Sequence, residues 1–245
     1  MRDTQVLREA LTYAATHGLA VLLPAQDPFL SAGCAHEGAV ATRLGLSAIP
    51  DSAETTELAR LIALARDTGA RVHAGPLSSA AGVAMLRQAH RDGVNLSAHT
   101  TSHHLHLSEA AIDGFDSRAH VTVSGSFVLE GDAKRMPFGE TAAGIAGIET
   151  LLSLMAELVA RDVCDWPSAL ARVTVGPARA LGLAAGGLSV DAPADVCVFD
   201  PRAHWQVEPE QLRSQGHNTP FAQWTLPARV ESVRLAGRAF APGPS

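Results

Sequence analysis

Apolar positions in the first hundred residues alternate between helical spacing and short continuous runs. Residues spaced three and four apart predict amphipathic helices, and each helix is followed by a run that predicts a strand. The run Leu19–Leu23 is uniformly apolar, which predicts a strand buried on both faces of a parallel sheet. The predicted helices span residues 4–18, 51–69 and 79–93, and the predicted strands span 19–23, 71–76 and 94–100. This order predicts an α/β fold with right-handed crossovers.

Polar residues and glycines set the limits of these helices. Thr4 and Ser79 are expected N-caps, and Asp51 with Glu54 is expected to form a capping box. Glycines 18, 69 and 93 are expected to end the three helices. Each connection is therefore only a few residues long, as a layered α/β domain requires.

The alternation stops near residue 102, and the pattern changes again near residue 186. A fourth strand is predicted at 119–123, a loop at 124–139, and a long helix at 141–161 whose apolar stripe includes Ile145 and Ile148. Two short helices follow, one from Pro167 to Val173 and one begun by Pro177. Short alternating strands are predicted at 188–190, 195–200 and 230–236. We therefore predict an α/β region at 1–185 and a small β portion at 186–245.

Composition narrows the class of protein. The chain has 245 residues, of which 47% are hydrophobic and 18% charged, so it can bury a substantial core. A net charge of -6 and few aromatic residues argue against nucleic-acid binding. The three cysteines show no CxxC spacing. No apolar run approaches the ~20 residues of a membrane span, and the N-terminus lacks a signal-peptide pattern. A cytoplasmic protein is expected.

Several stretches resemble a known family. Residues Gly187–Asp200, GLSVDAPADVCVFD, resemble the C-terminal signature of the amidohydrolase superfamily. Others look like the dihydroorotase family: Leu11–Ala14, Gln26-Asp27, Ala35–Gly38, Arg43–Leu46, Ala53–Thr55, Arg213 and Asn218–Phe221. The resemblance implies a metal-dependent TIM barrel flanked by a small β-sandwich. Because at most four barrel strands can be identified here, we expect a partial barrel with a C-terminal β-sandwich portion.

The chain departs from this family at the positions that should bind zinc. The resemblance places two strand-end zinc histidines at Pro24 and Pro76, and a proline ring has no lone pair to offer a metal. No His-x-His motif lies near the N-terminus, Thr122–Ser126 lacks the family's asparagine and arginine, and the segment of the catalytic aspartate is missing. We therefore predict no catalytic residue, no metal ligand and no cofactor.

Some polar residues remain around these positions. Gln26, Asp27, His36 and Glu37 are expected to form a vestigial pocket, in which Gln26 and Asp27 brace the following loop. Among the histidines that cluster at the end of the third strand, His99 and His103 are candidate ligands for a replacement metal. The alternative is that these histidines lie on the surface or only support neighbouring groups.

Three functional hypotheses follow from the resemblance. The first is a non-catalytic dihydroorotase-like subunit of pyrimidine biosynthesis, which binds the catalytic subunit of aspartate transcarbamoylase in a hetero-oligomer and stabilises it. The second is a zinc-dependent dihydroorotase that hydrolyses a cyclic amide, and the third is a degenerate, truncated fragment. An incomplete sheet favours partner contacts, because exposed strand edges and apolar faces must be covered.

Overall fold

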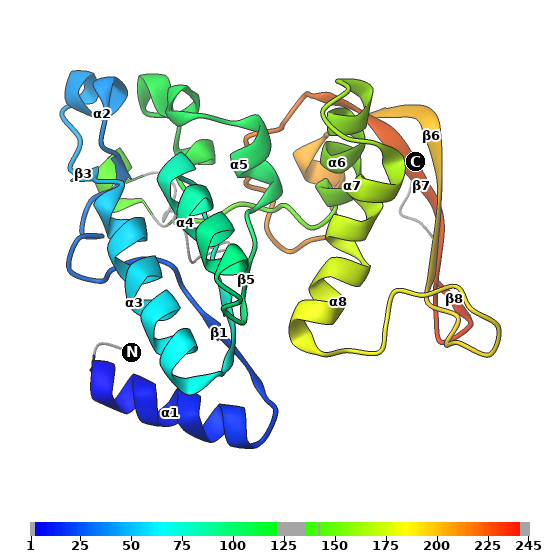
Figure 1. Ribbon diagram of the computed structural model, residues 1–245. Coiled ribbons are helices and arrows are strands. Elements are labelled where there is room, and N and C mark those ends of the chain that lie inside the picture. Colours follow the sequence, from blue (N-terminus) through cyan, green and yellow to red (C-terminus); the bar gives the residue numbers. More distant parts are fainter. Residues whose placement is uncertain (1–2, 122–135, 142, 241–245) are drawn as a thin grey trace. The chain divides into compact units, whose positions relative to one another are not determined.

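The chain folds into two compact units, Met1–Ile145 and Ala146–Ser245 (Figure 1). The computed structural model describes residues 3–121, 136–141 and 143–240. The division falls 40 residues before the predicted boundary at 185/186. Three helices that we had assigned to the first region therefore group with the C-terminal strands.

The first unit is built on a parallel sheet in the order β1-β4-β5. The strands are β1 (Ala20–Leu23), β4 (Arg71–Ala74) and β5 (Leu96–Ala98), each shorter than its predicted run. Leu22 pairs with His73, and His73 pairs with Ser97. The parallel arrangement predicted from the helix-strand alternation is confirmed.

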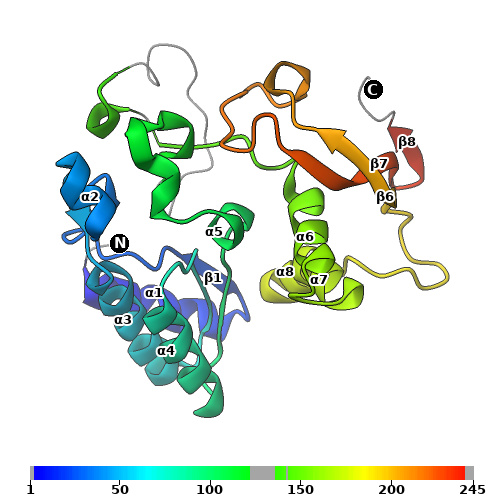
Figure 2. The same cartoon turned by 90° about the horizontal axis from the view of Figure 1, so that it is seen from above.

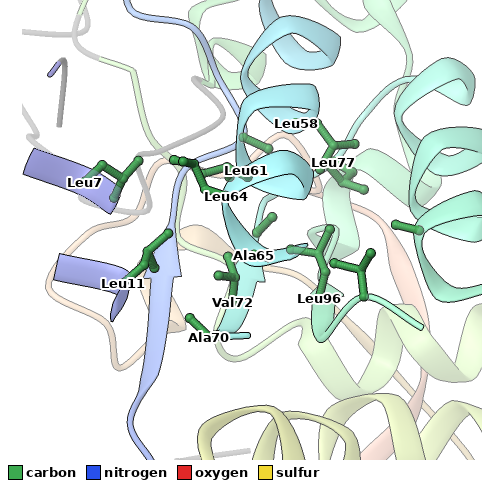
Figure 3. Packing of buried hydrophobic residues seen from close by; sticks show 14 residues of the cluster. Leu7, Leu11, Leu58, Leu61, Leu64, Ala65, Ala70, Val72, Leu77 and Leu96 are labelled. Atoms are coloured by element: carbon green, nitrogen blue, oxygen red, sulfur yellow. The ribbon is translucent and has the colours of Figure 1, made fainter. Parts of the chain in front are cut away.

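Three helices pack together on one side of β1 (Figure 2). They are α1 (Thr4–Thr16), α3 (Ser52–Thr68) and α4 (Ala80–Arg91). Their leucines meet the strands in a dry core that joins Leu7 and Leu11 of α1 to Leu58 and Leu61 of α3 and to Val72 of β4 (Figure 3).

The predicted caps are only partly correct. Asp3, rather than Thr4, caps α1, and its carboxylate accepts hydrogen bonds from the amides of Gln5 and Val6. The Asp51 side chain makes no capping bond. Ser79 does cap α4, as predicted, by accepting a hydrogen bond from the Gly82 amide at 2.9 Å.

The prediction that β1 is buried on both faces is wrong. Val72 and Ala74, on the helix-covered face of the neighbouring strand, are fully buried. Leu22 lies on the opposite face and is 55% exposed. The helices α1, α3 and α4 of the first unit all pack against the face that carries Val72 and Ala74.

Short elements complete the first unit. A separate two-stranded parallel sheet joins β2 (Ala35–His36) to β3 (Ala48–Ile49), and α2 (Ala39–Leu44) lies between them in the chain. Helix α5 (Ser102–His106) follows β5, and 3-10 helices span Glu109–Phe115, Ser117–Ala119 and Phe138–Glu140.

Two predictions fall in this last part of the first unit. The strand predicted at 119–123 is wrong where it can be checked, because Ala119 ends a 3-10 helix and His120 continues in irregular structure. Residues 122–135, which include most of the predicted loop 124–139, lie outside the described residues. Phe138, at the end of that predicted loop, begins a 3-10 turn.

The second unit begins with irregular chain and continues with three helices. These are α6 (Leu151–Ala160), α7 (Trp166–Val173) and α8 (Val175–Leu181). The long helix predicted at 141–161 is thus wrong before Leu151. Gly144, which has φ 143°, and Gly147 disfavour helix there. Ile148, assigned to the buried stripe, is 86% exposed.

The C-terminal strands form one antiparallel sheet in the order β6-β7-β8. They span Val196–Gln206, Thr225–Leu235 and Arg238–Phe240, and a 3-10 turn, Pro209–Gln211, lies after the first. Residues 188–190 are not a strand, because Leu188 and Val190 are exposed and unpaired with the sheet. None of the helices among the described residues is both long and apolar enough to span a membrane.

Candidate functional site

The carboxyl ends of β1, β4 and β5 lie at one edge of the parallel sheet, where α/β proteins commonly place their sites. Pro24 follows β1 and Pro76 follows β4 by two residues, so both prolines lie at this edge. Pro24 is exposed, whereas Pro76 is buried after a cis Gly75-Pro76 bond. Neither ring can donate a lone pair to a cation.

Asp27 braces the loop after β1. One of its carboxylate oxygens accepts hydrogen bonds from the amides of Phe29, at 2.8 Å, and Leu30, at 3.1 Å. Its own amide donates to the carbonyl of Ala53 at 2.7 Å, at the start of α3. Gln26 is half-buried beside it. The geometry of Asp27 is that of a turn-forming residue, as the sequence suggests.

Backbone hydrogen bonds and a contact between two imidazoles connect the carboxyl ends of β4 and β5. The Leu77 amide donates to the His99 carbonyl at 2.8 Å, and the His99 amide donates to the Ala74 carbonyl at 3.2 Å. His73 Nε2 and His99 Nδ1 are 2.9 Å apart, and their rings stack with centroids 5.0 Å apart. His73 Nδ1 lies 2.8 Å from Ser97 Oγ.

Burial favours the neutral form of both imidazoles. Burial, followed by the charge of His99, lowers the pKa of His73 below its usual 6.5. Burial also lowers the pKa of His99. Both nitrogens of His73 are engaged, and one of the two nitrogens at the shared bond must carry the proton. Both ring nitrogens of His73 therefore have a hydrogen-bond partner. The ring lies on the face of the sheet opposite to α1, α3 and α4.

The other metal candidate, His103, is not paired with His99. It lies in α5 and packs against His104, with ring centroids 4.6 Å apart. Burial, with a smaller effect of His104, lowers the pKa of His103 to about 4. Its buried Nε2 atom has no hydrogen-bond partner within the residues that the structure describes. His104 Nδ1 instead lies 2.7 Å from Thr101 Oγ1.

His36 and Glu37 lie at the end of β2, and their contacts differ from those of Gln26 and Asp27. His36 ends β2, with its ring nitrogens 3.8 Å from Asp51 Oδ1 and 3.9 Å from Glu109 Oε2. The Glu37 amide donates to the Ile49 carbonyl at 2.9 Å. Among the described contacts, no hydrogen bond or ion pair joins these two residues to Gln26 or Asp27.

The most densely bonded polar group at this edge was missed by sequence reasoning. Glu54, assigned to a capping box, is only 6% exposed and accepts hydrogen bonds from both the amide and the hydroxyl of Ser78 and of Ser79. The distances run from 2.6 to 3.3 Å, and the Ser79 amide is shared between the two carboxylate oxygens. The adjacent serines near a strand end were the available signal, but their acceptor lies 24 residues earlier in the chain.

The described residues do not fit a zinc ion. Structural and catalytic zinc sites take three or four His, Cys, Asp or Glu ligands at one point. Across residues 3–121, 136–141 and 143–240, no three such side chains are arranged to hold a metal. At the sheet edge the available histidines bond to one another and to serine.

Comparison with solved structures first defines the fold class. The chain superposes on dihydropyrimidinase from Brevibacillus agri NCHU1002 with a TM-score of 0.80 at 19% identity. It superposes on L-hydantoinase from Arthrobacter aurescens with a TM-score of 0.81 at 16% identity. In both cases 98% of this chain aligns with 60% of the other. The fold is that of the amidohydrolase-type hydantoinases over this part of their length.

Comparison with curated proteins is more specific. A dihydroorotase-like protein of Pseudomonas aeruginosa is 38% identical over 96% of this chain. A dihydroorotase of Syntrophotalea carbinolica is 33% identical over the same share. No protein-family model matches. Over 96% of its length the chain is therefore similar in sequence to proteins named dihydroorotase-like protein and dihydroorotase. It covers 61% of the length of these two relatives.

Proposed function

We propose that the chain is a non-catalytic, dihydroorotase-like structural protein of pyrimidine biosynthesis that supports aspartate transcarbamoylase. The observation that carries the proposal is the pair of prolines at the sheet edge. Pro24 and Pro76 stand where the family resemblance places zinc histidines, at the exits of β1 and β4. Losing both ligands removes the means of activating a water molecule for amide hydrolysis.

The neighbouring hydrogen bonds support the same proposal. The His73–His99 pair and the Glu54–serine contacts are self-contained, so the edge is held by the protein's own groups. We further propose that the two units correspond to part of an amidohydrolase-type barrel and part of its C-terminal β-sandwich. In this proposal the fold has a structural role, in which it supports the transcarbamoylase and catalyses no reaction.

Apolar side chains near β1 support a role in protein contacts. Leu22 is 55% exposed, Phe29 is 71% exposed, and Leu19 and Leu30 also reach the surface. Burying such side chains against a partner is worth roughly 25 cal/mol per Å² before the costs of association. We propose the catalytic subunit of aspartate transcarbamoylase as this partner, in a cytoplasmic hetero-oligomer.

A zinc-dependent dihydroorotase is the second candidate. It is favoured by relatives such as the Syntrophotalea carbinolica protein, whose name is dihydroorotase. In this alternative, zinc would be required, and its ligands would have to come from outside the sheet edge described above. The two candidates therefore differ in zinc content and in turnover.

One experiment separates them. Zinc content and dihydroorotate hydrolysis are measured on the purified protein, alone and after mixing with the transcarbamoylase. The proposal expects less than stoichiometric zinc, no hydrolysis, and a complex that raises the thermal stability of the transcarbamoylase. Stoichiometric zinc with turnover would establish the alternative instead. A transcarbamoylase from an unrelated assembly, mixed at the same concentration, controls for non-specific association.

A further inference from the structure

Strand register brings a serine and two histidines together on the face of the β1-β4-β5 sheet that α1, α3 and α4 leave uncovered. His73 of β4 pairs with Ser97 of β5, so the two side chains lie on the same face. His99 comes two residues after Ser97 and continues on that face just past the end of β5. Leu22, the partner of His73 in β1, is 55% exposed there. The three polar groups therefore lie next to surface that solvent reaches.

The hydrogen bonds among these side chains run in one direction. Ser97 Oγ is 2.8 Å from His73 Nδ1 but 3.5 Å from the Val72 carbonyl oxygen, so the hydroxyl donates to the imidazole. Because Nδ1 of the neutral His73 ring accepts this bond, Nε2 carries the ring proton and donates it to His99 Nδ1 at 2.9 Å. The order of donation is serine to first histidine to second histidine.

This order of groups is the one that activates a serine. A serine hydroxyl is a weak nucleophile, and an adjacent imidazole that takes its proton makes it a stronger one. In such sites a third group accepts the other N–H of the imidazole and so fixes its tautomer and orientation. Burial, followed by the charge of His99, lowers the pKa of His73. The His73 ring is therefore neutral at neutral pH and can accept the Ser97 proton.

Gly75 makes room for the third group. A Cβ atom at residue 75 would stand 2.8 Å from His99 Nδ1 and 3.0 Å from His99 Cε1, closer than such atoms pack. The backbone of Gly75 also has φ 141°, a conformation that glycine adopts readily and other residues rarely adopt. A larger residue would therefore move the His99 ring away from His73. Glycine at this position is what lets the two imidazoles meet.

We propose that Ser97 is a nucleophile that takes an acyl group from an activated ester, such as an aryl ester, with His73 as its general base and His99 as the positioning residue of that base. Ser97 Oγ attacks the carbonyl carbon of the ester while its proton moves to His73 Nδ1. The bond between the carbonyl carbon and the aryloxide then breaks, and the aryloxide takes that proton and leaves as the phenol. The product is an acylated serine, and the step uses no other reagent.

The same geometry limits the reaction to one acyl group per chain. The Gly75 amide already donates to the Leu23 carbonyl, and the His99 amide already donates to the Ala74 carbonyl, so neither amide is available to stabilise an oxyanion. An aryl ester tolerates this lack, because aryloxide is a stable leaving group, whereas hydrolysis of the acylated serine would have to expel an alkoxide. We therefore expect acylation without turnover. This modification site is independent of the proposed structural role.

The proposal is tested on the purified full chain with p-nitrophenyl acetate at neutral pH. We expect a burst of about one p-nitrophenol per chain and, in peptides from the acid-quenched protein, an acetyl group on Ser97. Ser214 is an internal control, because it is also half-buried but its hydroxyl lies 2.9 Å from the carboxylate of Glu149, a weaker base than imidazole. Ser97 should be acetylated at least about a hundredfold faster than Ser214. Equal rates, or no acetyl group on Ser97, would overturn the proposal.

Two substitutions identify the nucleophile and its base. Ser97→Ala should abolish the burst, and Ser214→Ala should retain it. A burst that survives in Ser97→Ala would place the nucleophile elsewhere, for example on an imidazole, and the proposal would be wrong. His73→Gln should slow acetylation of Ser97 by about a hundredfold. If His73→Gln does not fold, the comparison of Ser97 with Ser214 in the wild-type chain still decides the proposal.

The positioning role of His99 has its own readout. His99→Leu removes the acceptor of the His73 Nε2 proton and should slow acetylation of Ser97 by about tenfold or more. His99→Glu supplies a carboxylate acceptor at the same place and should restore the rate, which a charged side chain in a merely structural position would not do. A wild-type rate in His99→Leu would overturn the positioning role, and so would an equally slow rate in His99→Glu.

Discussion

The two faces of the β1-β4-β5 sheet carry opposite kinds of contact. On the helix-covered face, Val72 and Leu96 are buried against Leu58 and Leu61 of α3. On the other face, Leu22 is exposed, and His73 bonds to Ser97 and His99. One face therefore supplies hydrophobic stabilisation, and the other holds polar pairs beside exposed apolar surface.

This contrast between the two faces shows which part of the first unit is stabilised by the unit's own residues alone. The helix-covered core needs nothing from outside to exclude water, because α1, α3 and α4 complete it. The opposite face has no such cover among the described residues of the unit, and parallel sheets are ordinarily covered on both faces. Substitutions on the two faces should therefore differ strongly in their effect on stability.

The largest expected effect comes from shortening a leucine in the core. Leu61→Ala removes a fully buried side chain and should lower the free energy of unfolding by about 2–5 kcal/mol. Leu22→Ala, on the open face, should change it by less than about 0.5 kcal/mol. Urea unfolding of the two variants measures both values. Equal losses would mean that Leu22 is covered in solution, and the contrast between the faces would be lost.

Acidification to pH 4 should cost about as much as the lower part of the range expected for Leu61→Ala. His103 is held neutral because burial, with a contribution from His104, lowers its pKa from 6.5 to about 4. Since the unfolded chain binds this proton at higher pH, the stabilisation is complete above about 6.5 and is lost as pH falls toward 4. The loss from this one group should reach about 3 kcal/mol.

The acid effect is measured from urea unfolding between pH 7 and pH 4. His103→Leu should flatten the dependence, because no buried imidazole then remains to be protonated at that position. His17→Gln, which replaces an exposed histidine after α1, should retain the wild-type slope. If His103→Leu also retained it, the acid sensitivity would have to come from other groups, such as the His73–His99 pair.

The sequence was sufficient for features that depend on neighbouring residues. Ser79 and Gly69 were assigned correctly as helix limits, because a cap acts within one turn of its own helix. The parallel order of β1, β4 and β5 also followed from helix-strand alternation. By contrast, the helix predicted through Ile148 does not form. Gly144 and Gly147 lower the helix propensity of this segment, and the spacing of its apolar residues does not compensate for that loss.

Contacts between distant segments could not be predicted in the same way. Glu54 has the spacing of a capping box with Asp51, so its sequence position suggests a local role. Its observed donors come from another strand-helix connection, and only the packing of α3 against α4 brings them together. The exposure of Leu22 likewise depends on which face the helices occupy, which periodicity alone leaves undetermined.

The smallest expected effect concerns the two imidazoles on the open face. Two influences lower the pKa of His73, burial first and the charge of His99 second. His99→Gln removes only the second, so the pKa of His73 should rise while remaining below 6.5. An NMR titration of the ring protons measures the change, and His90→Gln on α4 serves as the control. Because the two rings are in direct contact at 2.9 Å, an unchanged value would mean that the His73–His99 hydrogen bond is not formed in solution.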